Sequence, residues 1–142
     1  MRFVDTNVLL YAVSTLPKES TKRRQARNVL RRSDLAVSVQ VFQEFYYQAT
    51  HPERPIQMSH DEAVAFLGRF LSFPVQEINL NIFRAAVANC ERFGLSYWDG
   101  AILAAARALG CDAVYSEDLS SEQDCDGVRV INPFRGSGVK KE

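Results

Sequence analysis

The amino-acid sequence predicts a doubly wound α/β domain, with a mainly parallel central sheet of four to five strands and helices on both faces. Short apolar runs alternate along the chain with longer segments whose apolar residues follow the helical period. Apolar strands that alternate with helices imply a parallel sheet covered on both sides. The 142 residues, 46% of them hydrophobic and 24% charged, suit one ordinary domain with a sizeable core.

The first half of the chain contains two strand candidates and three helix candidates. Their order is strand 2–5, helix 8–13, helix 19–32, strand 35–39 and helix 41–50. The short run that ends in Asp5 is followed by a longer apolar stretch, which predicts a strand, a tight turn and a helix. The second helix has a narrow apolar stripe, which indicates a surface position. Pro52 and Pro55 exclude further helix after residue 50.

The second half adds three helix candidates and three strand candidates. Their order is helix 59–71, short strand 75–78, helix 79–94, helix 96–110, strand 112–116 and strand 127–131. Ser59 and Glu62 have the spacing of a capping box, which opens the first of these helices. Asn79 or Asn81 caps the second, and Gly94 ends it.

Composition limits the class of protein. Seventeen Lys and Arg residues balance seventeen Asp and Glu residues, so the chain does not bind nucleic acid through bulk positive charge alone. The apolar runs are too short for a membrane span and the first residues do not form a signal peptide, so we expect a cytoplasmic protein without membrane contact. The spacing of the three cysteines indicates neither a disulfide framework nor a zinc site.

We expect a single domain over 1–135 and a flexible tail over 136–142, which is rich in Gly, Ser and Lys.

Four acidic residues fall where a parallel sheet would bring them to one edge. Asp5 ends the first strand and Asp118 follows a later one, so right-handed crossovers place both at the edge where ligands collect. Glu44 lies in the first turns of the helix that follows the second strand. Asp99 shares the apolar i, i+3, i+4, i+7 row of its helix, and a carboxylate on a row that faces the core needs a partner.

Each of these acids also has a simpler interpretation. Asp5 could cap the helix after the first strand, for a gain of about 1 kcal/mol, and Asp99 completes a capping pattern that starts at Ser96. Glu44 taken alone fits a solvated helix position, and Asp118 fits an ordinary turn. Four carboxylates in one cleft would repel one another unless a cation or raised pKa values relieved them. Oxygen ligands without Cys or His favour Mg²⁺ or Mn²⁺.

Four sequence blocks carry a family resemblance. They are DTNVLLY at 5–11, QEFY at 43–46, LSYWDGAI at 95–102, and YSEDL at 115–119 with NPF at 132–134. In this order they resemble the successive blocks of PIN-domain ribonucleases, and above all those of the bacterial VapC toxins. The resemblance covers the chain except its last few residues. It implies a three-layer α/β/α fold, endonucleolytic cleavage of single-stranded or looped RNA, a homodimer, and an antitoxin that covers the cleft or inserts an Arg into it.

The resemblance also implies roles for individual residues. The family's acidic positions that bind Mg²⁺ or Mn²⁺ match Asp5, Glu44, Asp99 and Asp118, and its small polar positions match Thr6, Asn7 and Ser116. Glu117 departs from the pattern, because an acid directly before Asp118 could replace or assist it. One or two metal ions held by carboxylates would activate a water molecule for attack on a phosphodiester. His51 and His60 are not expected to be catalytic.

A basic segment over 18–32 is the candidate RNA contact, with Arg23, Arg24 and Arg27 at its centre. Its simpler interpretation is a solvated helix face. The aromatic residues that could stack on unpaired bases are Tyr46, Tyr47, Tyr97 and Trp98, but their helical spacing also fits core or interface positions, so none is assigned to the substrate.

Two other functions compete with a metal-dependent nuclease. A phosphatase would use Asp5 as its nucleophile, but enzymes of the haloacid dehalogenase type carry a second acid two residues later, where this chain has Asn7. A PIN fold that keeps its acids could also serve only to bind RNA or a partner without cutting. The presence of all four acidic blocks favours the nuclease.

Overall fold

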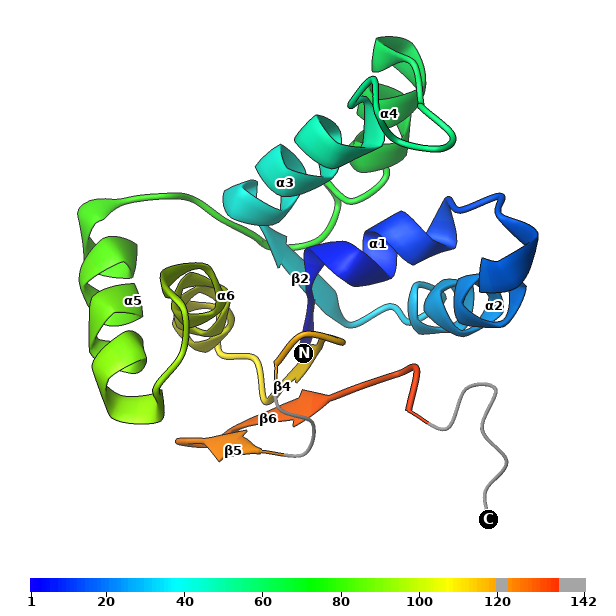
Figure 1. Ribbon diagram of the computed structural model, residues 1–142. Coiled ribbons are helices and arrows are strands. Elements are labelled where there is room, and N and C mark those ends of the chain that lie inside the picture. The colour runs from blue at the N-terminus through cyan, green and yellow to red at the C-terminus, as the bar shows by residue number, and fades with distance from the viewer. Residues whose placement is uncertain (120–122, 136–142) are drawn as a thin grey trace.

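In the computed structural model, which describes residues 1–119 and 123–135, the chain forms a sheet flanked by helices (Figure 1). Over these residues the sheet has six strands in the order β3-β2-β1-β4-β6-β5. They are β1 (Arg2–Val4), β2 (Leu35–Ser38), β3 (Val75–Gln76), β4 (Ala113–Tyr115), β5 (Asp124–Cys125) and β6 (Val128–Ile131). Only the β5–β6 pair is antiparallel among them. The predicted α/β class is confirmed, with one strand beyond the four to five expected.

The additional strand is β5, which the sequence analysis missed. It is two residues long and pairs with β6 through a tight turn at Asp126 and Gly127, where φ is 55° and 90°. The Asp124 carboxylate accepts a hydrogen bond from the Gly127 N–H at 2.7 Å. The Asp-Gly dipeptide is the available sequence signal for such a hairpin. The predicted tail over 136–142 lies outside the described residues.

Six α-helices and one short 3₁₀ helix are found in the described part of the chain. They are α1 (Thr6–Ala12), η1 (Pro17–Glu19), α2 (Ser20–Val29), α3 (Val39–Ala49), α4 (His60–Gly68), α5 (Leu80–Phe93) and α6 (Tyr97–Ala108). The helix expected over 19–32 is shorter, because Pro17 opens a separate 3₁₀ turn and α2 ends at Val29. Asn79 rather than Asn81 caps α5, through its side chain and the Ile82 N–H at 2.9 Å.

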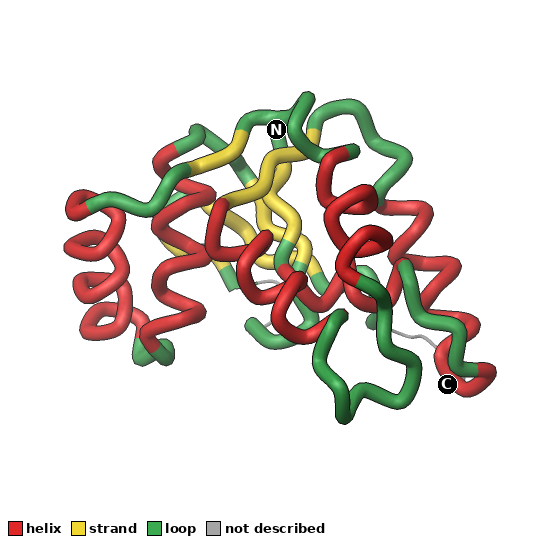
Figure 2. Tube along the Cα trace, turned by 90° about the horizontal axis from the view of Figure 1, so that it is seen from above, coloured by secondary structure: helices red, strands yellow, loops and turns green. Residues whose placement is uncertain are grey.

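Helices lie on both sides of the strands. Figure 1 shows α5 and α6 on one side and α1 and α2 on the other, and the view from above shows the sheet between the two groups (Figure 2). Every residue of β2 and of β4 is buried, as expected for strands covered on both faces. None of the helices described here combines the length and apolar character that crossing a membrane requires. The three cysteines are free thiols, as their spacing predicts.

The contact between α5 and α6 is close because Gly100 has no side chain. A Cβ atom at this position would lie 2.7 Å from the Ala86 carbonyl oxygen and 3.1 Å from the Cys90 sulfur. The buried Asn89 amide donates to the Gly100 carbonyl oxygen at 2.9 Å, and Arg107 donates to Asn89 Oδ1 at 3.3 Å. These contacts fix the beginning of α6, which carries Asp99.

Candidate active site

Asp5 is held at the end of the central strand β1. Its backbone N–H donates to the Tyr115 carbonyl oxygen at 3.0 Å, which continues the ladder between β1 and β4. Its carboxylate accepts from the Thr6 N–H and from the Ser116 hydroxyl, both at 2.7 Å. The side chain is 5% exposed, and burial raises the pKa of Asp5 to about 7, with the charges of Glu44 and Asp118 acting in the same direction. Asp5 therefore both caps α1 and lies at the carboxyl edge of the sheet.

Glu44 reaches the same edge from α3. The Thr6 hydroxyl donates to Glu44 Oε1 at 2.6 Å, and the Gln40 amide donates to Oε2 at 3.2 Å. Gln40 also donates to the Trp98 carbonyl oxygen at 3.3 Å, so this buried amide connects α3 with α6. Thr6 on α1 and Gln40, one turn earlier on α3 itself, thus orient the Glu44 carboxylate.

Asp99 lies in the first turn of α6. Its row continues through Ile102, Leu103 and Ala106, which are buried as predicted, whereas Asp99 itself is half-buried at the edge of the sheet. The Ser96 side chain accepts from the Asp99 N–H at 3.2 Å, so Ser96 caps α6, which is one of the two hydrogen bonds of the predicted capping pattern. Burial raises the pKa of Asp99, and the negative charges of Asp118 and Glu44 add to this effect.

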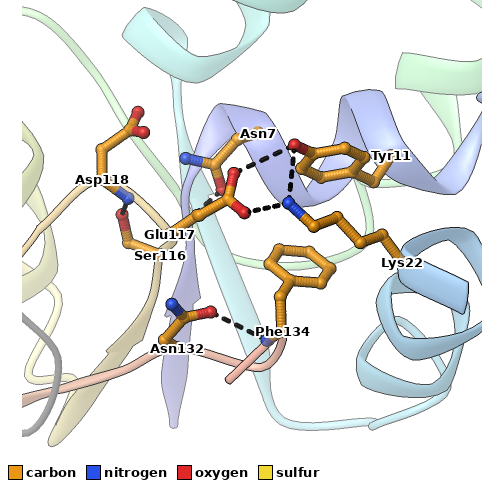
Figure 3. A network of polar contacts seen from close by, with 8 residues as sticks. All are labelled: Asn7, Tyr11, Lys22, Ser116, Glu117, Asp118, Asn132 and Phe134. Carbon is orange, nitrogen blue, oxygen red and sulfur yellow. Dashed lines mark hydrogen bonds and ion pairs between the residues drawn. The ribbon is translucent and has the colours of Figure 1, made fainter. Parts of the chain in front are cut away.

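Asp118 and Glu117 point in different directions (Figure 3). Glu117 accepts from Lys22 at 2.5 Å and from the Tyr11 hydroxyl at 3.0 Å, which directs it toward α2. Lys22 lies 4.8 Å from the centre of the Tyr11 ring and 5.8 Å from that of Phe134. The exposed Asp118 is held at its backbone by the Ser116 hydroxyl, which accepts its N–H at 3.2 Å. Lys22 belongs to the basic segment over 18–32. Its charge thus neutralises Glu117, the acid directly before Asp118.

The four acids predicted from the sequence line one hollow of about 220 Å³. Its walls are formed by Asp5, Thr6, Asn7, Leu10, Gln40, Glu44, Gln48, Trp98, Asp99, Ile102 and Asp118. Glu117 is absent from these walls. Ser116 lies behind Asp5 as a hydrogen-bond donor. We call this hollow the acidic pocket.

The donor set of the acidic pocket is compatible with Mg²⁺ or Mn²⁺. In the described residues, no three Asp, Glu, His or Cys side chains are already grouped closely enough to hold a metal ion. Mg²⁺ commonly keeps several waters and uses only one or two carboxylates, so separated acids around a wet pocket suit it. The Asn7 Nδ2 atom is buried and has no hydrogen-bond partner among the described residues. Figure 3 draws this nitrogen on the side of Asp118. It is a donor, so it suits an oxygen atom of a bound ligand.

Sequence reasoning missed Gln40, Gln48 and Trp98 as parts of this pocket. Gln40 and Gln48 lie four residues before and after Glu44 on α3, and this spacing is the signal that could have found them. Trp98 precedes Asp99 at the start of α6.

The basic segment is partly structural. Arg23 donates to the Ser14 carbonyl oxygen at 3.0 Å and Arg27 to that of Ala12 at 2.8 Å, so both fasten α2 to the end of α1. Arg24 is exposed, and together with Arg23, Arg27 and Arg31 it borders a broad hollow of about 640 Å³. None of these arginines lines the acidic pocket. Their contact with RNA stays a prediction.

A parallel sheet with carboxylates gathered at the carboxyl ends of its strands defines an α/β protein with an acidic pocket suited to a divalent cation. The PIN domain model matches residues 2–121, and the chain belongs to the PIN domain family. The comparison with curated proteins gives no match.

Solved structures share the fold. A chain of a toxin-antitoxin complex from Klebsiella pneumoniae is 19% identical, with a TM-score of 0.69 over 94% of this chain and 98% of that chain. The sarcin-ricin loop cleaving toxin VapC20 of Mycobacterium tuberculosis is 20% identical, with a TM-score of 0.63 over 83% and 90%. DNA-bound VapBC from Salmonella typhimurium is 20% identical, with a TM-score of 0.60 over 91% and 95%. At 19% and 20% identity, these similarities show a shared fold and no more.

Proposed function

We propose that this protein is a divalent-metal-dependent endoribonuclease that hydrolyses RNA phosphodiester bonds and acts as the toxin of a toxin-antitoxin pair. The observation that carries the proposal is the acidic pocket, to which four separate parts of the chain each contribute one carboxylate. Carboxylates that share one pocket repel one another, and a bound divalent cation relieves this repulsion.

The residues of the acidic pocket have different roles. Asp5 and Asp99 are the principal ligands for Mg²⁺ or Mn²⁺, and Glu44 and Asp118 complete the set directly or through water. When bound, the ion lowers the pKa of its water and neutralises charge that develops on the phosphate. Ser116 holds the Asp5 carboxylate, and Thr6 holds that of Glu44.

Asn7 contributes a substrate contact. Its buried, unpartnered Nδ2 donates to an oxygen of the scissile phosphate, which satisfies a group that otherwise costs free energy. Because a phosphatase with Asp5 as nucleophile would need an acid at this position, Asn7 favours hydrolysis by an activated water.

The similar structures support the toxin role, since they include a toxin-antitoxin complex and a toxin that cleaves the sarcin-ricin loop. An antitoxin that offers an Arg would pair with the carboxylates of the acidic pocket. A homodimer would cover part of the exposed apolar surface, which includes Val64 on α4 and Leu71 just after this helix.

The test compares wild type with Asp99→Asn on total bacterial RNA in Mg²⁺, Mn²⁺ or EDTA, with new 5′ ends mapped by sequencing. We expect discrete cuts that require metal and are absent from the variant. Equal cutting by wild type and variant would refute the assignment of the site. Absence of cuts with either metal would favour a PIN fold that binds RNA or a partner without catalysis.

A further inference from the structure

The face of α3 that carries Glu44 continues beyond the acidic pocket. Glu44, Tyr47, Gln48 and His51 follow one another at i, i+3, i+4 and i+7, so they lie on one side of the helix. His51 comes just after the helix end at Ala49. At 1.5 Å per residue, the row extends about 10 Å from Glu44. It leads from the candidate metal ligands to the protein surface.

A second hollow adjoins the acidic pocket along this row. It has a volume of about 300 Å³ and is lined by Tyr47, Gln48, His51, Glu53, Arg54 and Pro55. Gln48 lines both hollows. A ligand chain that occupies the acidic pocket therefore reaches the second hollow by passing over one side chain. We call this second hollow the Tyr47 subsite.

Tyr47 differs from the other two tyrosine candidates in what it contacts, whereas the exposed Trp98 lines the acidic pocket itself. Tyr47 is 66% exposed, and its ring forms an edge-on pair with the His51 ring, at 5.4 Å between centroids. The Tyr46 hydroxyl is engaged with His60 at 3.0 Å, and the Tyr97 ring lies against Phe83. Among the tyrosines in the described part of α3 and α6, Tyr47 thus has the most accessible ring face.

Two donors stand beside this ring. The Glu53 N–H donates to His51 Nδ1 at 3.1 Å, so in the neutral ring the proton is on Nε2, which is left to donate to a ligand. Arg54 borders the same hollow, and in the described residues it forms no ion pair. An aromatic face with two adjacent N–H donors suits a base attached to a phosphate.

We propose that the Tyr47 subsite binds the nucleotide next to the scissile phosphate, with the base stacked on Tyr47 and the phosphate bound by His51 and Arg54. This inference rests on the proposed ribonuclease function. A base that stacks on a side chain must be unpaired, so the subsite selects single-stranded or looped RNA over a duplex. Tyr47 is a specificity-determining residue in this arrangement, and the metal ligands are unaffected by its removal.

The test measures binding without cleavage. Fluorescence anisotropy in EDTA gives the Kd of a labelled, unstructured 12-nucleotide RNA and of a matched duplex for wild type, Tyr47→Ala, Tyr47→Phe and Phe83→Ala. Phe83 is the matched control, since it is an exposed aromatic residue on α5 that lines neither hollow. We expect Tyr47→Ala to weaken single-strand binding about fivefold or more, the loss of one base–aromatic stack. Tyr47→Phe and Phe83→Ala should bind the single-stranded RNA with a Kd within about twofold of that of wild type. The Kd for the duplex should stay within about twofold of wild type in every variant.

Two outcomes would overturn the subsite. One is that Tyr47→Ala binds the single-stranded RNA with the affinity of wild type. The other is that Phe83→Ala loses as much affinity as Tyr47→Ala. The cleavage assay in Mn²⁺ keeps the two proposals apart. If wild type binds RNA through Tyr47 without cutting it, the nuclease fails, and Tyr47 remains a contact of bound single-stranded RNA. If wild type cuts and Tyr47→Ala keeps its Kd and KM, the subsite fails and the nuclease stands.

Discussion

At the scale of single residues, the buried Asp5 makes the stability of the protein depend on pH. Its pKa is raised from 3.8 to about 7 chiefly by burial. Between these two pH values the folded protein retains a proton that the unfolded chain has released. The stability of the metal-free protein therefore falls as pH rises through this range and levels off above it. A metal ion bound by Asp5, as proposed above, must displace this proton below about pH 7, so we expect metal affinity to rise with pH there.

The variant Asp5→Asn tests this account. The amide carries no charge at any pH and retains an oxygen for the Thr6 N–H and a donor for Ser116. In EDTA we expect its Tm to exceed that of wild type by a few degrees at pH 8, with the difference lost at pH 4. Added Mn²⁺ should raise the Tm of wild type and leave that of the variant unchanged. A pH-independent difference between the two metal-free proteins would contradict the cause assigned to the shift.

The sequence predicted the residues of the acidic pocket better than the contacts that orient them. Asp5 and Asp118 follow strands, so the sheet edge could be inferred from chain order alone. The partner of Glu117 could not, because Lys22 is 95 residues away and belongs to a run of similar cations. Gln40 was missed for a related reason: a buried amide that bridges two helices has no local signature.

At the scale of secondary-structure elements, the contact between α5 and α6 positions Asp99. Gly100→Ala would place a methyl group 2.7 Å from the Ala86 carbonyl oxygen, which is backbone and cannot turn aside. We expect a loss of about 1 to 3 kcal/mol in the free energy of unfolding. We also expect slower RNA cleavage, because α6 must shift.

Gly68→Ala is the matched control for this prediction. A Cβ atom at Gly68 meets nothing within 4 Å, so the same change at the end of α4 should leave stability equal or slightly higher. Urea unfolding of both variants measures the difference. Equal stability of Gly100→Ala and wild type would show that the two helices adjust without cost.

Helices and strands were predicted well where the apolar periodicity of the sequence was strong. They were predicted poorly where a segment forms a strand only because it pairs with another strand. The buried β2 and β4 were found within one or two residues. The hairpin strand β5 offers only Asp124 and Cys125, too few for any period, and its existence depends on pairing with β6. The helix expected over 19–32 was too long, because its charged residues continue past the structural end at Val29.

At the scale of the whole molecule, zero net charge conceals a separation of charge. Carboxylates gather in the acidic pocket, while arginines gather on α2 around the hollow that contains Arg24. Of the three arginines predicted to contact RNA, Arg24 is the one whose head group is not engaged with the end of α1. It therefore offers the cleanest test of the basic segment.

We expect Arg24→Gln to lower the slope of log Kd against log salt concentration for RNA binding by about 1, the change that corresponds to the loss of one phosphate contact. Arg84→Gln, an exposed arginine on α5, is the control and should leave the slope unchanged. Anisotropy titrations at four salt concentrations measure both slopes. Equal slopes for Arg24→Gln and wild type would assign the segment to a solvated helix face.

The position of β1 in the sheet has a consequence for biosynthesis. Residues 2–4 come before the other strands of the sheet in the chain, yet their strand lies between β2 and β4, and β4 comprises residues 113–115. The Ser116 hydroxyl that holds Asp5 is added 111 residues after Asp5 itself. A ribosome-bound nascent chain therefore cannot assemble the acidic pocket until residues 113–118 have emerged.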